Sequence, residues 1–178
     1  MGTAAISLIA FFLVLGAAFT AIGDALGIPG RSAETQRAAW DQALRLVDTD
    51  VQALSADPTS TLLVTDVDVL IENTGRTKFA SSDFPEWEVV VRYQDTLGSE
   101  RFEYITYAEA VSAGNWTVEQ IYLDESTSTA EAYEPGIFNP NEQMVINVRL
   151  FRVLGINTTN SVTISTPEGD RSSVLFNG

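Results

Sequence analysis

Histidine and cysteine are both absent from this chain of 178 residues. The absence of histidine removes the side chain that most often serves as a general base or a metal ligand near neutral pH. The absence of cysteine excludes a disulfide framework and thiolate chemistry, and it leaves the redox compartment undetermined. A domain built from this chain therefore depends on packing and hydrogen bonds for its stability.

Basic residues are scarce, since 10 Lys and Arg stand against 24 Asp and Glu and the formal net charge is −14. Binding of nucleic-acid phosphates needs clustered Lys and Arg, so the composition excludes nucleic acid as a partner. An excess of acid is typical of a solvated outer surface on which copies repel one another. With 45% hydrophobic residues, the chain has enough apolar material for one globular domain with a real core.

Motifs of common enzyme classes are missing as well: there is no Gly-rich phosphate loop, no nucleophile elbow and no metalloprotease pattern. Two carboxylate pairs, Asp66/Asp68 at strand spacing and Asp124/Glu125 beside a turn, have the residue types that calcium or glycoside hydrolysis requires. In so acidic a chain such pairs arise by chance, and we interpret them as solvated surface. We therefore expect no catalytic residue, no cofactor, no metal and no enzymatic activity.

The N-terminus is the longest stretch without charge, because no residue from Met1 to Gly23 carries a charged side chain. As a helix this segment would span about 35 Å, and the hydrocarbon core of a bilayer is about 30 Å thick. A helix that is apolar on all sides must be surrounded by lipid or by protein. The bulky residues that we predict to form such a helical core are Ile6, Leu8, Ile9, Phe11, Phe12, Leu13, Leu15, Phe19 and Ile22.

Three interpretations of this segment are open. A secretory signal peptide should begin with basic residues and be shorter, yet the first basic residue is Arg31. A transmembrane anchor should carry basic and aromatic residues at its flanks, which are missing here. Removal of a basic leader, so that Met1 begins the mature chain, would explain an apolar helix without a charged flank.

A second helical pattern follows a Gly- and Pro-containing break, which predicts a kink near residues 27–30. Apolar residues then recur at spacings of three and four, as on one face of a helix. These residues are Trp40, Leu44, Val47, Val51 and Leu54. We therefore predict one kinked N-terminal helix over residues 1–57, whose second part packs on its own domain or on neighbouring subunits.

From Thr61 onward the hydrophobic period changes to two, which predicts strands. The expected strands are residues 63–72, 87–93, 101–107, 116–123, 143–150, 161–166 and 173–176. Short strands at this spacing are typical of an antiparallel sandwich or barrel. The predicted fold class is α+β: a long hydrophobic N-terminal α-helix followed by an antiparallel, immunoglobulin-like β-sandwich over residues 58–178.

Two Asn-x-Thr sequons begin at Asn115 and Asn157. Both are candidate N-glycosylation sites if the domain lies outside the cell.

Three segments of the predicted sandwich resemble archaellins, the archaeal flagellins, and related archaeal type IV pilins. Residues 67–79, VDVLIENTGRTKF, are similar to the strand and Asn-Thr-Gly turn that open the archaellin outer domain. Residues 138–150, FNPNEQMVINVRL, resemble its Pro-x-Glu turn and following strand, and residues 162–176, VTISTPEGDRSSVLF, resemble its closing hairpin. Position 5 is Ala5, without the glutamate typical of bacterial type IV pilins, which points to the archaeal branch.

This resemblance implies a structural subunit of an extracellular helical filament, an archaellum or archaellum-like pilus for motility or adhesion. Its implied partners are other copies of the chain, the membrane before assembly, a prepilin-type peptidase and an ATP-driven assembly platform. The subunit would polymerise through its N-terminal helix and display its sandwich at the cell surface. The alternative is a membrane-anchored, stator-like accessory protein that binds the cell envelope through its sandwich.

Overall fold

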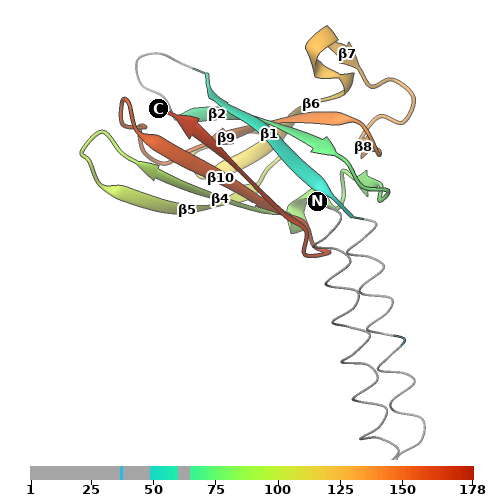
Figure 1. Cartoon of the computed structure of the whole chain (residues 1–178), viewed down its shortest axis with the longest axis horizontal. Coiled ribbons are helices and arrows are strands. Elements are labelled where there is room, and N and C mark those ends of the chain that lie inside the picture. Colours follow the sequence, from blue (N-terminus) through green and yellow to red (C-terminus); the bar gives the residue numbers. More distant parts are fainter. Residues whose placement is uncertain (1–36, 38–48, 60–64) are drawn as a thin grey trace, which may run out of the picture. The chain divides into compact units, whose positions relative to one another are not determined.

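The computed structural model describes Arg37, residues 49–59 and residues 65–178. The chain divides into two compact units, Met1–Val47 and Asp48–Gly178. The second unit, called the β unit below, is built from strands (Figure 1). Within the described residues, no helix has the length and apolar character needed to cross a bilayer.

The regular elements of the β unit are short strands and two 3-10 helices of three residues each. The strands are β1 (Val51–Pro58), β2 (Asp66–Asn73), β3 (Phe79–Ala80), β4 (Glu88–Gln94), β5 (Glu100–Tyr107), β6 (Asn115–Asp124), β7 (Thr129–Ala130), β8 (Ile137–Phe138), β9 (Gln143–Arg149), β10 (Thr159–Ser165) and β11 (Arg171–Asn177). The 3-10 helices are η1 (Phe84–Glu86) and η2 (Glu125–Thr127).

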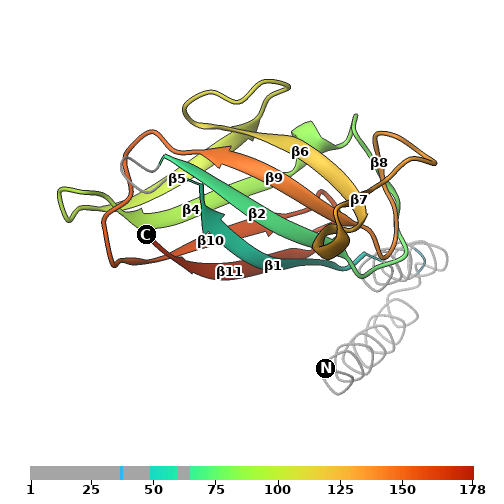
Figure 2. The ribbon, with the colours of Figure 1, turned by 90° about the horizontal axis from the view of Figure 1, so that it is seen from above.

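One sheet of nine strands forms most of the β unit. Its order is β1-β2-β9-β6-β5-β4-β10-β11, with β7 added to β6, while β3 and β8 form a separate small ladder. β5 and β6 pair in parallel over two positions only, Thr106 with Asn115 and Tyr107 with Trp116. The sheet folds over at this narrow joint, so that β1, β2, β9 and β6 lie across from β5, β4, β10 and β11 (Figures 1 and 2).

The two outermost strands of the sheet, β1 and β11, lie side by side and nearly close it into a barrel. Backbone groups of β1 bond to side chains here: the Val51 N–H donates to Asp170 Oδ2 at 2.5 Å, and the Ala53 N–H donates to Ser172 Oγ at 2.9 Å. Side-chain acceptors thus occupy the edge of β1, which is otherwise a site for pairing with another chain.

The predicted α+β class is wrong for this structure. In residues 49–59 and 65–178 the class is all-β, and β1 occupies Val51–Pro58, where the end of the long helix was predicted. Val51 and Leu54 fit a helical stripe, but pairing with β2 buries Val51 and Ala53 and turns Leu54 outward at a bulge. The long apolar helix and its kink near 27–30 were predicted in a segment that, apart from Arg37, lies outside the described residues.

Most of the strands bury one of the two alternating sets of side chains that the sequence pattern indicates. Val67, Val69 and Ile71 of β2 are fully buried, as are Val89 and Val91 of β4. Between the two layers lies an aromatic cluster in which edge-to-face contacts recur, such as the 5.0 Å approach of two ring centroids in the Phe79–Trp87 pair. The cluster consists of Phe79, Phe84, Trp87, Trp116 and Phe138. Alternation at period two therefore located the core of the β unit correctly.

Candidate functional site

The Asn-Thr-Gly turn and the Pro-x-Glu turn, which carry much of the archaellin resemblance, meet at Asn73. This side chain is fully buried: its Nδ2 donates to the carbonyls of Thr77 at 2.8 Å and Phe138 at 3.2 Å. Its Oδ1 accepts from the Gly75 N–H at 3.2 Å. The Asn73 backbone donates to the Glu142 carbonyl at 3.0 Å and accepts from the Asn141 N–H at 2.7 Å. One asparagine thus joins two turns that are far apart in sequence.

The Pro-x-Glu turn is closed by its own glutamate. The Glu142 carboxylate is buried and accepts from the Asn139 N–H at 2.7 Å and from Asn139 Nδ2 at 3.2 Å. Asn141 adopts a left-handed conformation with φ of 64°, which asparagine tolerates better than most residues. The carboxylate is therefore committed to holding the turn.

These turns also hold the start of β1. The Asp50 carbonyl accepts from the Gly75 N–H at 2.8 Å and from Thr74 Oγ1 at 3.1 Å, and the next N–H, of Val51, donates to Asp170. Asp170 belongs to the third archaellin-like segment, whose Pro-x-Gly turn closes through the Thr166 N–H to the Asp170 carbonyl at 2.9 Å. Two of the three motifs therefore bond directly to β1 where it begins.

Asp170 is half-buried at this junction. Burial raises the pKa of its carboxyl above the ordinary value of 3.8, and the nearby charge of Asp50 acts in the same direction, while the N–H groups of Val51 and Arg171 oppose it. Because the raised pKa belongs to the folded state, the folded protein binds this proton more tightly than the unfolded chain does. The ionised carboxylate therefore opposes folding at neutral pH, and the opposition disappears as the pH falls through the folded pKa.

We expect Asp170→Asn to leave the β unit at least as stable as the wild type at pH 7, because the amide oxygen still accepts from Val51 and carries no charge. The difference in free energy of unfolding between variant and wild type should shrink as the pH falls through the raised pKa. Urea titrations of residues 48–178 between neutral and mildly acidic pH would measure it. Asp170→Ala leaves the Val51 N–H without its acceptor, so this variant should be less stable than Asp170→Asn at every pH. If the stability difference between Asp170→Asn and the wild type did not change with pH, the raised pKa of Asp170 would be contradicted.

The carboxylate pairs noted in the sequence are engaged in ordinary structural contacts. Asp66 of β2 forms a bidentate ion pair with Arg149 at 2.6 and 2.9 Å, and Asp68 accepts from Asn147 Nδ2 at 2.6 Å. Asp124 caps η2 by accepting from the Ser126 N–H at 3.0 Å. The described residues hold no group of three or more possible metal ligands.

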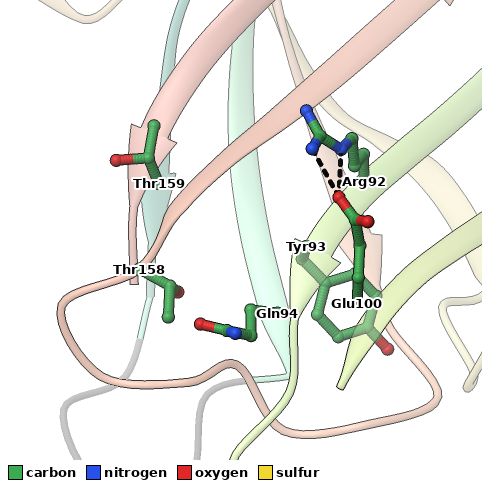
Figure 3. Close-up of a pocket in the computed structure, with 6 residues that line it drawn as sticks. All are labelled: Arg92, Tyr93, Gln94, Glu100, Thr158 and Thr159. Atoms are coloured by element: carbon green, nitrogen blue, oxygen red, sulfur yellow. Dashed lines mark hydrogen bonds and ion pairs between the residues drawn. The ribbon is translucent and has the colours of Figure 1, made fainter. Parts of the chain in front are cut away.

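An open hollow of about 340 Å³ lies at the end of β4 (Figure 3). Arg92 closes one side through its ion pair with Glu100, at 2.6 Å from Nε, and Gln94 and Thr158 lie opposite (Figure 3). Tyr93 is buried and donates its hydroxyl to Glu103; burial and this carboxylate raise its pKa far above the ordinary value, so it stays protonated. No nucleophile with an adjacent base lines the hollow.

The two sequons differ in their surroundings. In Asn115, the nitrogen to which a glycan would be attached, Nδ2, already donates hydrogen bonds to the carbonyl and hydroxyl oxygens of Thr106, at 3.2 and 2.8 Å. Asn157 is exposed in a left-handed turn with φ of 56°. Of the two predicted glycosylation sites, Asn157 is the more accessible. The filament-core residues predicted between Ile6 and Ile22 lie outside the described residues.

β5 displays two of its three aromatic side chains on the outside of the sheet. Ile105 is buried opposite β4, and this register turns Phe102 and Tyr104 outward, where they are 68% and 56% exposed. The inward positions are taken by Arg101 and Glu103. An exposed cluster of large apolar side chains is informative about binding, whereas a single one is not.

The inward charges of β5 are paired. Arg101 Nε donates to Asp95 Oδ2 at 2.8 Å, and Asp95 also accepts from the N–H groups of Leu97 and Ser99. The Ser99 N–H and the Arg101 guanidinium are the main groups that lower the pKa of Asp95. Glu103 accepts from Tyr93 and from the Phe151 N–H. A shift of register by one residue would break these bonds.

The exposed side of β11, β10, β4 and β5 forms a continuous surface, here called the apolar outer face. The name is used for its two central cross-strand rows: Leu175, Ser161, Arg92 and Phe102 in one, and Ser173, Thr163, Val90 and Tyr104 in the other. The rows beside them carry Glu88 and Arg171 at one end and Glu100 at the other. Leu175 is 71% exposed. The sequence did not predict this face, because residues 101–107, RFEYITY, have apolar side chains at both odd and even positions. Alternation alone therefore did not indicate which of the two sets faces inward.

No protein-family model and no curated protein matches this sequence. Among solved structures, the fold is similar to that of the archaellum periplasmic stator protein FlaG from Sulfolobus acidocaldarius, with a TM-score of 0.51, 20% identity, and coverage of 72% of this chain and 99% of that chain. The complex of FlaF and FlaG from the same organism matches with a TM-score of 0.50 and 21% identity, over 72% of this chain and 89% of that chain.

The archaeal flagellum of Methanospirillum hungatei also matches, with a TM-score of 0.50 and 12% identity, over 98% of this chain and 91% of that chain. At these identities the comparisons establish the fold. The resemblance to archaellins is thus confirmed at the level of the fold: the chain has an archaellin-like β unit.

Proposed function

We propose that this chain is a structural, non-enzymatic subunit of an archaellum or archaellum-like type IV filament, exposed at the cell surface and serving motility or adhesion. The observation that carries the proposal is the combination of an archaellin-like β unit with a preceding segment, Met1 to Gly23, that has no charged side chain.

An uncharged segment of this length needs an apolar environment at every stage. Lipid would supply it before assembly, and the same segments of other copies would supply it afterwards. Contacts of this kind involve different surfaces on successive subunits, so they propagate as an open helix. The proposal includes, as partners, a prepilin-type peptidase that exposes the segment and an ATP-driven platform that assembles the subunits.

A stator-like accessory protein is the second candidate. The observation that favours it is the match to FlaG, which covers 99% of that chain and has the higher TM-score, although both values are close to those for the flagellum. A protein of that kind would keep its N-terminal segment in the membrane and bind an envelope component through the β unit. Residues 1–23 themselves contain no Lys, Arg, Trp or Tyr, the residues that favour permanent membrane residence at the interfaces of a bilayer.

Comparing the whole chain with the β unit separates the two candidates. For a filament subunit, electron microscopy of sheared surface appendages should show polymers, and mass spectrometry should identify this chain, including its uncharged N-terminal segment, as their subunit. The β unit, residues 48–178, should remain monomeric and bind isolated envelope layer weakly in moderate salt, where charge effects are screened. Saturable micromolar binding by the β unit, with no filaments on cells, would instead support the accessory protein.

A further inference from the structure

We propose that the apolar outer face is the surface through which the β unit of one subunit packs against the β unit of a neighbouring copy in the filament. The inference rests on the proposed function and deepens it, because it names a contact between outer domains in addition to the N-terminal segments. It concerns the face formed by β11, β10, β4 and β5, described above.

The exposure of aromatic residues on this face is built into the fold. Ile105 sets the register of β5 against β4, and the bonds of Arg101 and Glu103 on the inward side hold it. Phe102 and Tyr104 therefore cannot turn inward without breaking the Arg101–Asp95 ion pair and the hydrogen bonds of Glu103. Exposed aromatic side chains held rigidly by a sheet lose little conformational freedom on binding, which is what makes them effective anchors of an interface.

Three polar side chains on this face already have partners, which lowers the cost of covering them. The Arg92 guanidinium is paired with Glu100 and lies over the Phe102 ring, 5.8 Å from its centroid. Thr163 Oγ1 and Ser173 Oγ share a hydrogen bond of 2.8 Å. Because these bonds can persist in a complex, these three side chains avoid the penalty for burying unpaired polar atoms.

The distribution of charge indicates a second copy of the chain as the occupant. On the exposed side of β11, β10, β4 and β5, the cations Arg92 and Arg171 balance the carboxylates of Glu88 and Glu100. The outer side of the opposite layer carries Asp57, Asp66, Asp68 and Glu72 against Arg149. Two subunits that each carry a net charge of −14 repel one another, so they can approach most closely through the side whose charges balance. A basic partner would be drawn to the acidic layer instead.

The absence of cysteine from the chain allows a direct test with single-cysteine variants. Tyr104→Cys and Leu175→Cys place a thiol on the apolar outer face, and Leu54→Cys places one on the outer side of β1 in the opposite layer. Leu54→Cys and Leu175→Cys replace the same residue type on exposed strands and are therefore matched. Each full-length variant is treated with a water-soluble maleimide, once as sheared filaments and once as unassembled subunit extracted in detergent.

We expect the thiols at positions 104 and 175 to react on the order of tenfold more slowly in filaments than in unassembled subunits, because a packed interface excludes water and reagent. The thiol at position 54 should react at similar rates in both states. A benzophenone maleimide attached at position 104 should give a cross-linked dimer of the chain, with the linked peptide identified by mass spectrometry. Tyr104→Cys and Leu175→Cys lie on different strands, so loss of assembly in one leaves the other informative.

Equal labelling in filaments and unassembled subunits at both positions would overturn the inference while leaving the proposed function intact. Cross-linking from position 104 to a different protein would also overturn it, since the occupant would not be a second copy. Absence of filaments from the unsubstituted chain would contradict the proposed function itself, and the inference with it.

Discussion

Replacement of Asn73 by alanine should lower the free energy of unfolding of the β unit by about 3 kcal/mol. The side chain is fully buried and makes three hydrogen bonds, to Gly75, Thr77 and Phe138. Alanine would leave the carbonyls of Thr77 and Phe138 without this donor in a region with little access to water, while the Gly75 N–H would keep its bond to the Asp50 carbonyl. Urea denaturation of residues 48–178, followed by tryptophan fluorescence, would measure the loss.

Asn177→Ala is the matched control, because Asn177 is exposed on β11; its effect should stay within about 0.5 kcal/mol. Asn73→Asp separates hydrogen bonding from side-chain volume, since it keeps the shape and the acceptor but loses both donors. It should be at least as destabilising as alanine at neutral pH. A loss below about 1 kcal/mol for Asn73→Ala would show that the two turns hold together without this residue.

Placing a carboxylate in the uncharged segment should abolish filaments. Leu13→Asp puts one charge in every subunit, and an unpaired charge in an apolar environment costs several kcal/mol per copy. Because all subunits carry the same fault, no wild-type neighbour compensates for it. Electron microscopy of sheared appendages, with immunoblotting of membranes to show that the subunit is still made, would measure the effect.

Glu125→Gln in η2 provides the comparison for Leu13→Asp, since it changes charge by one unit on the surface of the β unit. It should leave the number and length of filaments unchanged. Normal polymerisation of the Leu13→Asp protein would show that the uncharged segment is not the element of assembly and would remove the main support for a filament subunit.

Much of the β unit was predictable from local pattern. The seven expected strands correspond to β2, β4, β5, β6, β9, β10 and β11, with ends displaced by a few residues. In β4 the alternating set Val89, Val91 and Tyr93 is buried, as expected for one face of a strand that packs on a core. Such predictions succeed because side chains on a strand alternate between its two faces. A strand that is buried on one face therefore shows an alternation of apolar and polar residues in the local sequence.

Elements with no such trace were missed or misassigned. β1 was read as the end of a helix, because Val51 and Leu54 fit a spacing of three as well as they fit a strand with a bulge. β3, β7 and β8 are two residues long, which is too short for any period to be visible. Their positions are set by pairing with residues far away in sequence, such as Phe79 with Phe138.

The sequence alone determined the uncharged N-terminal segment, the acidic character and the seven strands with a clear alternation, because composition and period are local properties. The tertiary structure decided three further points. Residues 51–58 form a strand because they pair with β2. Phe102 and Tyr104 face outward because the β4–β5 register places Ile105 in the core. The two distant turns lie together because both bond to Asn73. Each of these depends on which distant groups share a buried space, and a local pattern does not contain that information.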